Sequence, residues 1–499
     1  MKKEFEKVTP EALGIRSQGI LEFVERMKKE SIELHTLSVM RHGKQCYECY
    51  WAPYNAETPH IMYSFSKSLT ATAIGFAEQE GILSLDEKLI DIFPDESPAE
   101  PSENLKKADL WSLLTMTCGH KTEIEWGRPD ADPNWIRTFL HHEFVYEPGT
   151  TFMYNTAGTN LLCAVLAKKT GQQPTEFLKS RLFEPLGMSD IHCLTLPDGT
   201  EMGGAGMYMT LDDMTRFGQF MLDRGAWEGK QLLRSEWFDR AATKQVETLS
   251  DAYETGWDNW AIGYGFQCWM CKPEGSFRAD GAFGQFALVF PKEDLMVAVN
   301  SASSDANMLI NAVYDTIMKG LSGDALPEDP ETQARLAAFA ESASVQVLWG
   351  VRPRMVEQSL AGVIYDAEPG TVSFTDFTGG SGRARLDGRE MKALGFRFGS
   401  DRVYLQVTQG HHTDTLEAGL GGKITSKIFM GNLYGASAMW ISNHELLVDV
   451  RYVKGVSGAR LLFDFSEDGV RITRRATLPE SPLLMDFGGD VMTLRKRQA

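Results

Sequence analysis

The sequence contains no long uninterrupted apolar run, few cysteines and a deficit of positive charge. No stretch reaches the roughly 20 apolar residues that cross a bilayer, and the charged segment 1–7 lacks the apolar run of a secretory signal. Seven cysteines in 499 residues are too few for a disulfide framework. The net charge of −18 disfavours a nucleic-acid-binding surface, which needs concentrated positive charge. We therefore expect a cytoplasmic protein that binds neither membrane nor nucleic acid.

Signatures of metal and nucleotide sites are also scarce. The pairs Cys46-x-x-Cys49 and Cys268-x-x-Cys271 have the spacing of zinc ligands, but both fall in strand-like segments. Residues three apart on a strand face opposite sides of it, which makes chelation awkward. The histidine pairs 141–142 and 411–412 belong to no His-Glu-x-x-His helix, and no glycine-rich phosphate loop follows a strand. We expect no metal and no cofactor.

What remains is the composition of an ordinary globular chain, with 43% hydrophobic and 24% charged residues. The pattern of residue types changes near residue 322. The segment 322–330 is acidic and contains two prolines, which is typical of a linker. A short helical pattern follows over 332–341. We predict a first domain over residues 1–325, a linker and short helix over 326–340, and a second domain over 341–499.

The first domain mixes strands and helices. Its patterns predict strands over 34–40 and 45–51 and a hairpin of 286–290 with 295–300. Helical spacing predicts helices over 66–81, 110–116 and 159–169, the first ended by Gly81 and the last by Gly171. Strands at both ends of a domain with helices between them indicate an α+β layered fold.

The second domain consists of short strands separated by turns. The predicted strands cover 370–374, 402–407, 445–452, 461–465 and 470–473. Evenly spaced short strands with turn residues between them indicate an all-β sandwich or barrel.

The chemistry centres on Ser64 and Lys67, which form the single Ser-x-x-Lys element in the chain. They lie at the start of the predicted helix 66–81, where residues i and i+3 share one face, so the amine can reach the hydroxyl. The N-terminal end of a helix disfavours a protonated lysine, and a serine hydroxyl needs such a partner to act as a nucleophile. The alternative is a capping serine followed by a solvated lysine.

Several segments, taken in order, resemble the serine β-lactamase and penicillin-binding-protein-like superfamily, particularly its class C and esterase branch. They are 63–70, 81–89, 113–119, 147–155 and 203–214, followed by Gly281 and Gly284. The resemblance covers roughly residues 8–320 and implies an antiparallel sheet flanked by a helical lobe, with Ser64 at the seam. The second domain resembles the lipocalin-like barrels attached to some peptidases and D-aminopeptidases of this superfamily.

The resemblance implies roles for further residues. Tyr154 falls at the tyrosine of the family's Tyr-x-Asn motif and is expected to act as general base and then as acid; the alternative is a buried aromatic residue beside Phe152. The backbone amides of Ser64 and Ala282 are expected to form the oxyanion hole. Gly281 would permit the close backbone approach that this needs.

Two departures from the family pattern bear on the substrate. Thr156 stands where the family has asparagine, and Ala279-Asp280-Gly281 stands where it has Lys-Thr-Gly or His-x-Gly. Alanine supplies no cation, and Arg278 would face the opposite side of a strand. The site therefore lacks an obvious partner for a substrate carboxylate. Thr156, Ala279, Asp280 and Gly281 are the candidates for the substrate cleft.

The sequence thus predicts a serine hydrolase that cleaves an ester or amide bond of a small-molecule or peptide-like substrate through a Ser64 acyl-enzyme. Two alternatives stay open: a D-aminopeptidase or β-lactam hydrolase on the same scaffold, and a non-catalytic penicillin-binding-like protein. The second domain could cap the cleft, mediate a homo-oligomer, or only stabilise the protein.

Overall fold

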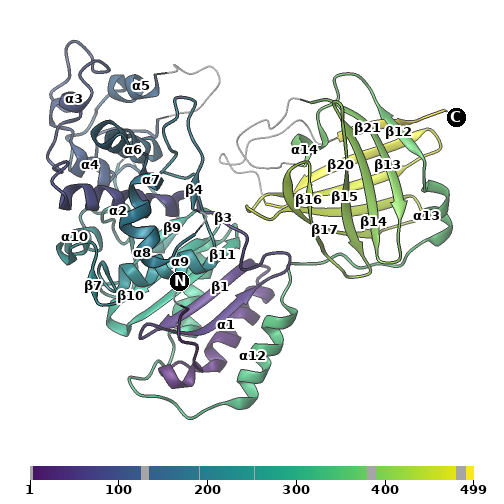
Figure 1. The fold of residues 1–499 in the computed structure, drawn as a ribbon, viewed down its shortest axis with the longest axis horizontal. Helices are drawn as coiled ribbons and strands as arrows, with labels where there is room; N and C mark the ends of the chain where they lie inside the picture. The colour runs from purple at the N-terminus through teal and green to yellow at the C-terminus, as the bar shows by residue number, and fades with distance from the viewer. Residues whose placement is uncertain are drawn as a thin grey trace.

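The computed structural model describes residues 4–124, 134–189, 191–251, 253–378, 389–478 and 491–498. Two units lie side by side along the long axis, a mixed α/β unit and a β-barrel near the C-terminus (Figure 1). The helix α12 (Pro330–Ser342) packs against α1 and β2 of the first unit. The exact domain boundaries at 325 and 341 stay a prediction.

The first unit is built on an antiparallel sheet with the strand order β2-β1-β11-β10-β9-β8. The predicted hairpin is present, with Phe286 opposite Val299 and Phe290 opposite Leu295. Strands from both ends of the unit therefore meet in the centre of one sheet. The strands are β1 (Glu33–Arg41), β2 (Lys44–Tyr50), β8 (Trp269–Met270), β9 (Phe277–Gly281), β10 (Gln285–Phe290) and β11 (Leu295–Ala302).

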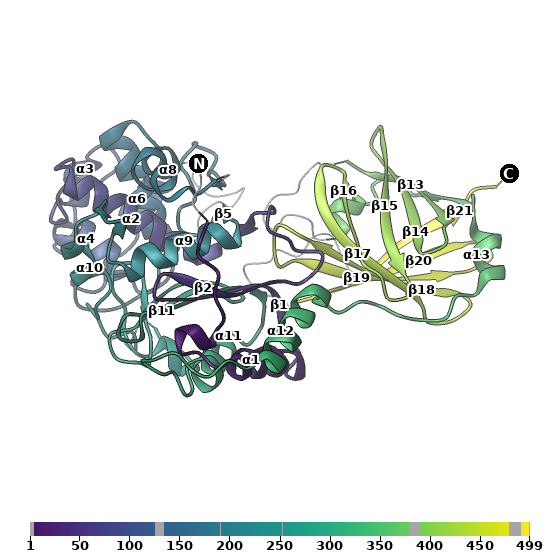
Figure 2. The ribbon, with the colours of Figure 1, turned by 60° about the horizontal axis from the view of Figure 1, so that its bottom comes forward.

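Alternation along the strands divides the side chains between two cores. In β10, Phe286 and Leu288 lie in one core together with residues of α1, whereas Ala287 and Val289 lie in the other with the helical lobe. The helix α9 (Leu211–Leu222) contacts β1, β10 and β11 on the lobe side. On the other side lie α1 (Ser17–Lys29), α11 (Ala306–Ala312) and α12 (Figure 2).

The three predicted helices of the lobe are present as α2 (Ser66–Gln79), α4 (Leu110–Leu114) and α6 (Thr156–Thr170). Helix α6 begins earlier than predicted because the Asn155 side chain caps it, accepting a hydrogen bond from the Gly158 amide at 3.1 Å. This places Thr156 in its first turn. The other lobe elements are α3 (Leu89–Ile92), α5 (Trp135–His141), α7 (Pro174–Leu178), α8 (Glu184–Leu186), α10 (Ser235–Ala241), and the small sheet of β3 (His60–Ile61), β5 (Met207–Met209) and β4 (His192–Cys193).

The second unit is a closed barrel, which confirms the all-β expectation. Nine of its described strands form the ring β15-β14-β13-β12-β21-β20-β19-β18-β17, closed by the parallel pairing of β17 with β15, and β16 pairs with β17. Closure leaves the ring strands without free edges. The strands are β12 (Ile364–Ala367), β13 (Met391–Phe398), β14 (Arg402–Gln409), β15 (His412–Leu420), β16 (Thr425–Phe429), β17 (Asn432–Trp440), β18 (Glu445–Tyr452), β19 (Gly458–Phe465), β20 (Gly469–Ala476) and β21 (Val491–Lys496).

One predicted strand, 370–374, is wrong. Gly370 turns the chain with φ of +85°, and the Ser373 side chain accepts a hydrogen bond from the Asp376 amide at 3.0 Å. Ser373 thereby caps the short helix α14 (Phe374–Phe377). Local capping chemistry outweighs the strand-like composition of this segment. A second short helix, α13 (Arg354–Leu360), packs against β13.

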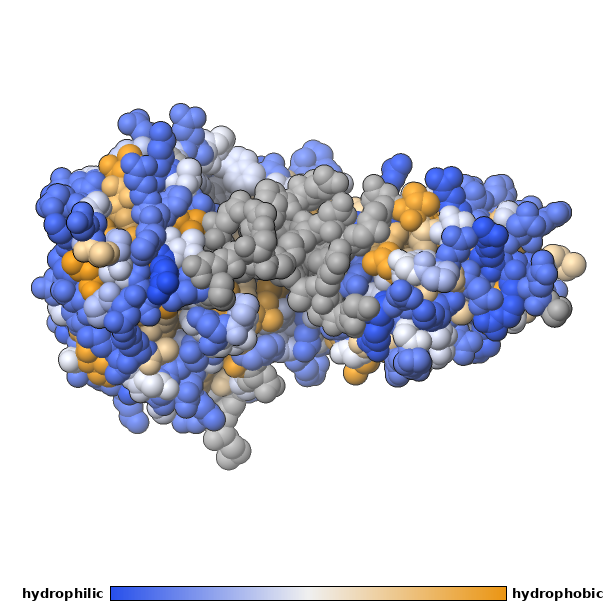
Figure 3. Space-filling view, turned by 90° about the horizontal axis from the view of Figure 1, so that it is seen from above, coloured by the Kyte–Doolittle hydropathy of each residue, from blue (hydrophilic) through white to orange (hydrophobic). Residues whose placement is uncertain are grey.

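The face shown in Figure 3 is mostly hydrophilic, with hydrophobic residues scattered over it. Among the helices described, none combines the length and the apolar composition that a membrane crossing requires.

Candidate active site

Ser64 lies in a single 3₁₀ turn, Tyr63–Phe65, between β3 and α2. The turn is held by backbone hydrogen bonds: the Met62 amide donates to the Met207 carbonyl at 2.8 Å, and the Phe65 amide donates to the Met62 carbonyl at 3.2 Å. Tyr63 has a φ of +47°, a conformation that costs energy for a residue with a side chain. Ser64 itself stays partly exposed, whereas Phe65 is buried. The hydroxyl at position 64 is therefore open to a substrate.

Lys67, in the first turn of α2, is only 1% exposed. Its Nζ lies 3.1 Å from the Ser64 Oγ, 3.3 Å from the Thr156 Oγ1 and 2.6 Å from the Gly204 carbonyl oxygen. A neutral amine has two hydrogens and one lone pair. It can donate to Thr156 and Gly204 while its lone pair accepts the proton of Ser64. The arrangement suits removal of the serine proton.

Tyr154 completes the group. The Lys67 Nζ lies 4.9 Å from the centroid of the Tyr154 ring, and this ring stacks on Trp269 at 5.6 Å between centroids. Burial raises the pKa of the Tyr154 phenol well above its usual value, although a hydrogen bond with Ser64 lowers this pKa. Asp280 and Glu123 raise the pKa further because their negative charges oppose a phenolate. At neutral pH the resting phenol is therefore protonated.

The end of β9 lies against the nucleophile turn. A Cβ atom at Gly281 would stand 2.1 Å from the Met62 carbonyl oxygen, so only glycine permits this approach. The next residue, Ala282, begins the turn into β10, where Phe283 has a φ of +65°. The Ser64 and Ala282 amides are the pair expected to hold an oxyanion, and the close approach at Gly281 brings the two segments that carry them together.

The remaining cleft candidates lie on different faces of β9. Ala279 is fully buried in the core between the sheet and the helical lobe, so it presents no surface to a substrate. Asp280 and Arg278 point to the other face, as alternation requires. The Arg278 guanidinium, also fully buried, donates to Asp280 at 2.8 Å and to the carbonyls of Met270 and Asn259 at 2.9 and 3.0 Å. Its complete burial and these three hydrogen bonds keep it from serving as a cation for a substrate carboxylate.

Asp280 is 8% exposed and close enough to Lys67 for their charges to interact. Burial raises the pKa of Asp280 to about 6, although Arg278 and Lys67 both oppose this rise. The carboxyl group is thus ionised at neutral pH and neutral below its pKa. It adds negative charge beside the nucleophile.

Sequence reasoning missed two groups of the site. The Gly204 carbonyl is a partner of Lys67, and the Glu123 carboxylate accepts a hydrogen bond from the Thr156 amide at 3.0 Å. The two adjacent glycines at 203–204 are the sequence feature that could indicate a close backbone approach here. A Cβ atom at Gly204 would stand only 2.7 Å from the Thr156 side chain, so a larger residue does not fit. No pattern in the sequence pointed to Glu123.

The cysteine pairs do not form part of this site. Cys49 is buried beneath the sheet and Cys46 is partly buried on the same strand. In the described portion of the chain, no cluster of three or more histidine, cysteine or acidic side chains is arranged to hold a metal ion.

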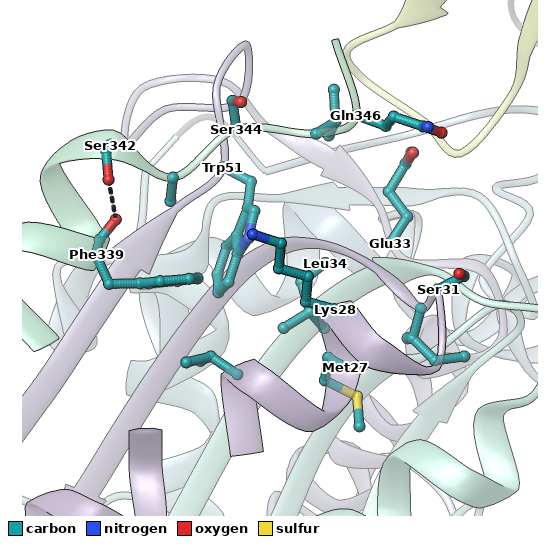
Figure 4. Close-up of a pocket in the computed structure, with 14 residues that line it drawn as sticks. Met27, Lys28, Ser31, Glu33, Leu34, Trp51, Phe339, Ser342, Ser344 and Gln346 are labelled. Carbon is teal, nitrogen blue, oxygen red and sulfur yellow. Dashed lines mark hydrogen bonds between the residues drawn. The ribbon is translucent and has the colours of Figure 1, made fainter. Parts of the chain in front are cut away.

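A separate hollow of about 510 Å³ lies between α1, β1 and α12 (Figure 4). Trp51 and Phe339 form its aromatic wall, and Lys28 and Glu33 lie among its polar lining residues. Of the serines that line it, none hydrogen-bonds to a lysine or histidine in the described structure. A serine hydroxyl that contacts a lysine amine lies at Ser64 instead.

Comparison with known proteins agrees with this architecture. Residues 23–315 match the model of the Beta-lactamase family. Penicillin-binding protein 4 of Amycolatopsis lactamdurans is 25% identical over 301 residues, 53% of this chain and 77% of that protein. The 6-aminohexanoate-dimer hydrolase of Paenarthrobacter ureafaciens is 25% identical over 286 residues, 54% of this chain and 72% of that enzyme.

A solved structure from Bacillus anthracis, provisionally named a 6-aminohexanoate-dimer hydrolase, superposes with a TM-score of 0.52 at 21% identity. The match covers 65% of this chain and 89% of that one. It shows that the two chains share a fold.

The contact at Gly281 gives a direct test of the site's construction. Gly281→Ala should lower the free energy of unfolding by about 2 kcal/mol, because the added methyl overlaps the Met62 carbonyl and forces the backbone apart. Urea unfolding measures the change. Gly256→Ala is the control, since a Cβ there meets nothing within 4 Å. Equal stability of the two variants would contradict the close approach.

Proposed function

This chain belongs to the Beta-lactamase family, and we propose that within this family of hydrolases it is a serine hydrolase whose nucleophile is Ser64. The observation that carries the proposal is the 3.1 Å contact between the buried Lys67 amine and the partly exposed Ser64 hydroxyl. Relatives named as hydrolases support the general class.

In the proposed first step, the Ser64 Oγ attacks the carbonyl carbon of an ester or amide while the Lys67 amine takes the hydroxyl proton. The amides of Ser64 and Ala282 hold the oxyanion that forms. Tyr154 then gives its phenolic proton to the leaving group and regains a proton from Lys67, since its raised pKa keeps it protonated at rest. An acyl-enzyme on Ser64 results.

In the second step, water attacks the acyl carbonyl carbon and loses a proton to the same lysine–tyrosine pair. The bond between the acyl group and the Ser64 Oγ breaks, the serine recovers its proton, and the carboxylic acid leaves. Thr156 and the Gly204 carbonyl keep the Lys67 amine in place during both steps, because both are hydrogen-bonded to it.

The charge of the cleft bears on the substrate. Ala279 is buried and uncharged, and the Arg278 donors are occupied, so a substrate carboxylate finds no free cation there. This supports an esterase or amidase over a β-lactam hydrolase. A second candidate is an aminopeptidase-like amidase, which the ionised Asp280 beside Lys67 favours because it would attract a substrate ammonium group.

Replacement of the nucleophile tests the proposal. Ser64→Ala should reduce hydrolysis of a p-nitrophenyl ester to the background rate, because it removes the hydroxyl that lies 3.1 Å from the Lys67 amine and would attack the substrate. Steady-state kinetics and a melting curve for each variant provide the measurement. Ser344→Ala, in the hollow of Figure 4, is the control and should keep wild-type turnover. Full activity of Ser64→Ala would refute the assignment.

The pH dependence of substrate choice tests the role of Asp280. Between pH 7 and pH 5 the carboxyl group passes from ionised to neutral, since its pKa is about 6. The attraction for an ammonium group is present above that pKa and lost below it. The ratio of kcat/KM for D-alanine p-nitroanilide over its N-acetyl derivative should therefore fall about tenfold over this range.

Taking this ratio cancels the pH dependence of the Lys67 and Tyr154 chemistry, which both substrates share. Asp280→Asn should show a ratio that does not change with pH. A flat ratio in the wild-type protein would remove the aminopeptidase-like candidate and leave the esterase or amidase.

A further inference from the structure

A short segment of the barrel, residues 453–457 between β18 and β19, lies next to the strand that leads to Ser64 and is here termed the seam turn. The Ile61 amide donates to the Lys454 carbonyl at 2.8 Å, and the Tyr54 hydroxyl donates to the Gly455 carbonyl at 3.4 Å. Ile61 is the last residue of β3, and the 3₁₀ turn that carries Ser64 follows directly. The seam turn is therefore bonded to the strand that leads into the nucleophile.

The side chains at this junction form a small apolar cluster. Val456 of the seam turn is 1% exposed and packs with Leu478 of the barrel and Ala302 at the end of β11. Tyr63 and Phe283 pack against this cluster, and their rings meet edge to face with centroids 5.4 Å apart. Tyr63 precedes Ser64, and Phe283 follows Ala282. The cluster thus touches the neighbour of each proposed oxyanion donor.

Both neighbours have a backbone that needs support. Tyr63 and Phe283 have φ values of +47° and +65°, in the left-handed region that favours glycine. Such residues keep this conformation only where their surroundings hold them. The Phe283 carbonyl accepts hydrogen bonds from the Ser301 hydroxyl at 2.6 Å and the Ser303 amide at 3.0 Å, which fixes its backbone from the first unit. The rings of Tyr63 and Phe283 pack against the apolar cluster to which the barrel contributes Val456 and Leu478.

The seam turn is itself firmly attached to both units. Val453 is fully buried in the core beneath the first unit's sheet. Arg451, at the end of β18, forms ion pairs with Glu33 of β1 at 2.9 Å and with Asp449 at 2.8 Å, and it is only 5% exposed. A buried ion pair of this kind fixes geometry, because loss of either partner leaves an uncompensated charge. The seam turn can therefore transmit support from the barrel.

We propose that the seam turn is a positioning element of the active site, and that Val456 holds Tyr63 and Phe283 so that the Ser64 and Ala282 amides converge on one oxyanion. The inference rests on the proposed function. Val456 is a positioning residue, because it acts through Tyr63 and Phe283. The barrel is then part of the catalytic unit.

Val456→Ala tests this role in the full-length protein. The loss of two methyl groups should weaken the positioning of the Ser64 and Ala282 amides, which bind the oxyanion in the transition state. The cleft that binds the substrate before reaction should be unchanged. We expect kcat for a p-nitrophenyl ester to fall about tenfold, with KM within twofold of the wild-type value. The rate constant for inactivation by a fluorophosphonate should fall by a similar factor, because that reaction uses the same oxyanion donors.

Val448→Ala is the matched control. Val448 lies in β18, the strand that leads into the seam turn, is fully buried, and belongs to the barrel's own core. This variant loses the same two methyl groups and should be destabilised as much, yet keep the wild-type kcat. Val456→Ile, which retains the apolar contact, should keep most of the activity. Leu478→Ala reports on the same cluster if Val456→Ala does not fold.

The outcomes separate the two proposals. If Val456→Ala and Val448→Ala have the same kcat, or if Val456→Ala changes only KM, the positioning role is overturned. If the wild-type protein shows no turnover that depends on Ser64, the proposed function fails instead. If kcat falls in Val456→Ala but not in Val448→Ala, and turnover by the wild-type protein depends on Ser64, the positioning role and the proposed function are both supported.

Discussion

The hydrogen bond between the Lys67 amine and the Ser64 hydroxyl is the interaction around which the first unit is arranged. A lysine that is 1% exposed needs partners for its remaining hydrogens, and these come from Thr156 and Gly204. Thr156 is available because Asn155 caps α6 one residue earlier, and Gly204 is near because it carries no side chain. Three segments that are distant in the sequence thus converge on one amine.

The electrostatics of the cleft distinguish this chain from the family pattern of a cation on β9. In β9 the buried Ala279 stands at the position of that cation. The neighbouring Arg278 is hydrogen-bonded to Asp280 and to two backbone carbonyls. The position of that cation is therefore uncharged, and the neighbouring Asp280 carboxylate is paired with Arg278. Burial, and after it the negative charges of Asp280 and Glu123, raise the pKa of the Tyr154 phenol and keep it protonated, which fits a proton donor to a leaving group better than a preformed base.

Much of this arrangement could be predicted from the sequence, because it depends on local spacing. Ser64 and Lys67 are three residues apart on a helix, and turn chemistry marks the strands of the barrel. The Gly204 carbonyl could not be assigned a role, since a backbone oxygen leaves no residue type to recognise. The apolar cluster of Val456, Leu478 and Ala302, against which Tyr63 packs, joins positions that lie far apart in the chain and could not be predicted from local spacing. The composition of segment 370–374 predicts a strand, but the Ser373 side chain caps a short helix there, and a cap of this kind depends on the local backbone conformation.

If Ser64 is the activated nucleophile of a folded site, a fluorophosphonate should label it in the native protein. Peptide mapping by mass spectrometry locates the label. One adduct is expected, on the peptide that contains Ser64, and no adduct after the protein is unfolded in urea. An adduct on a different serine, or none on the native protein, would contradict this role of Ser64.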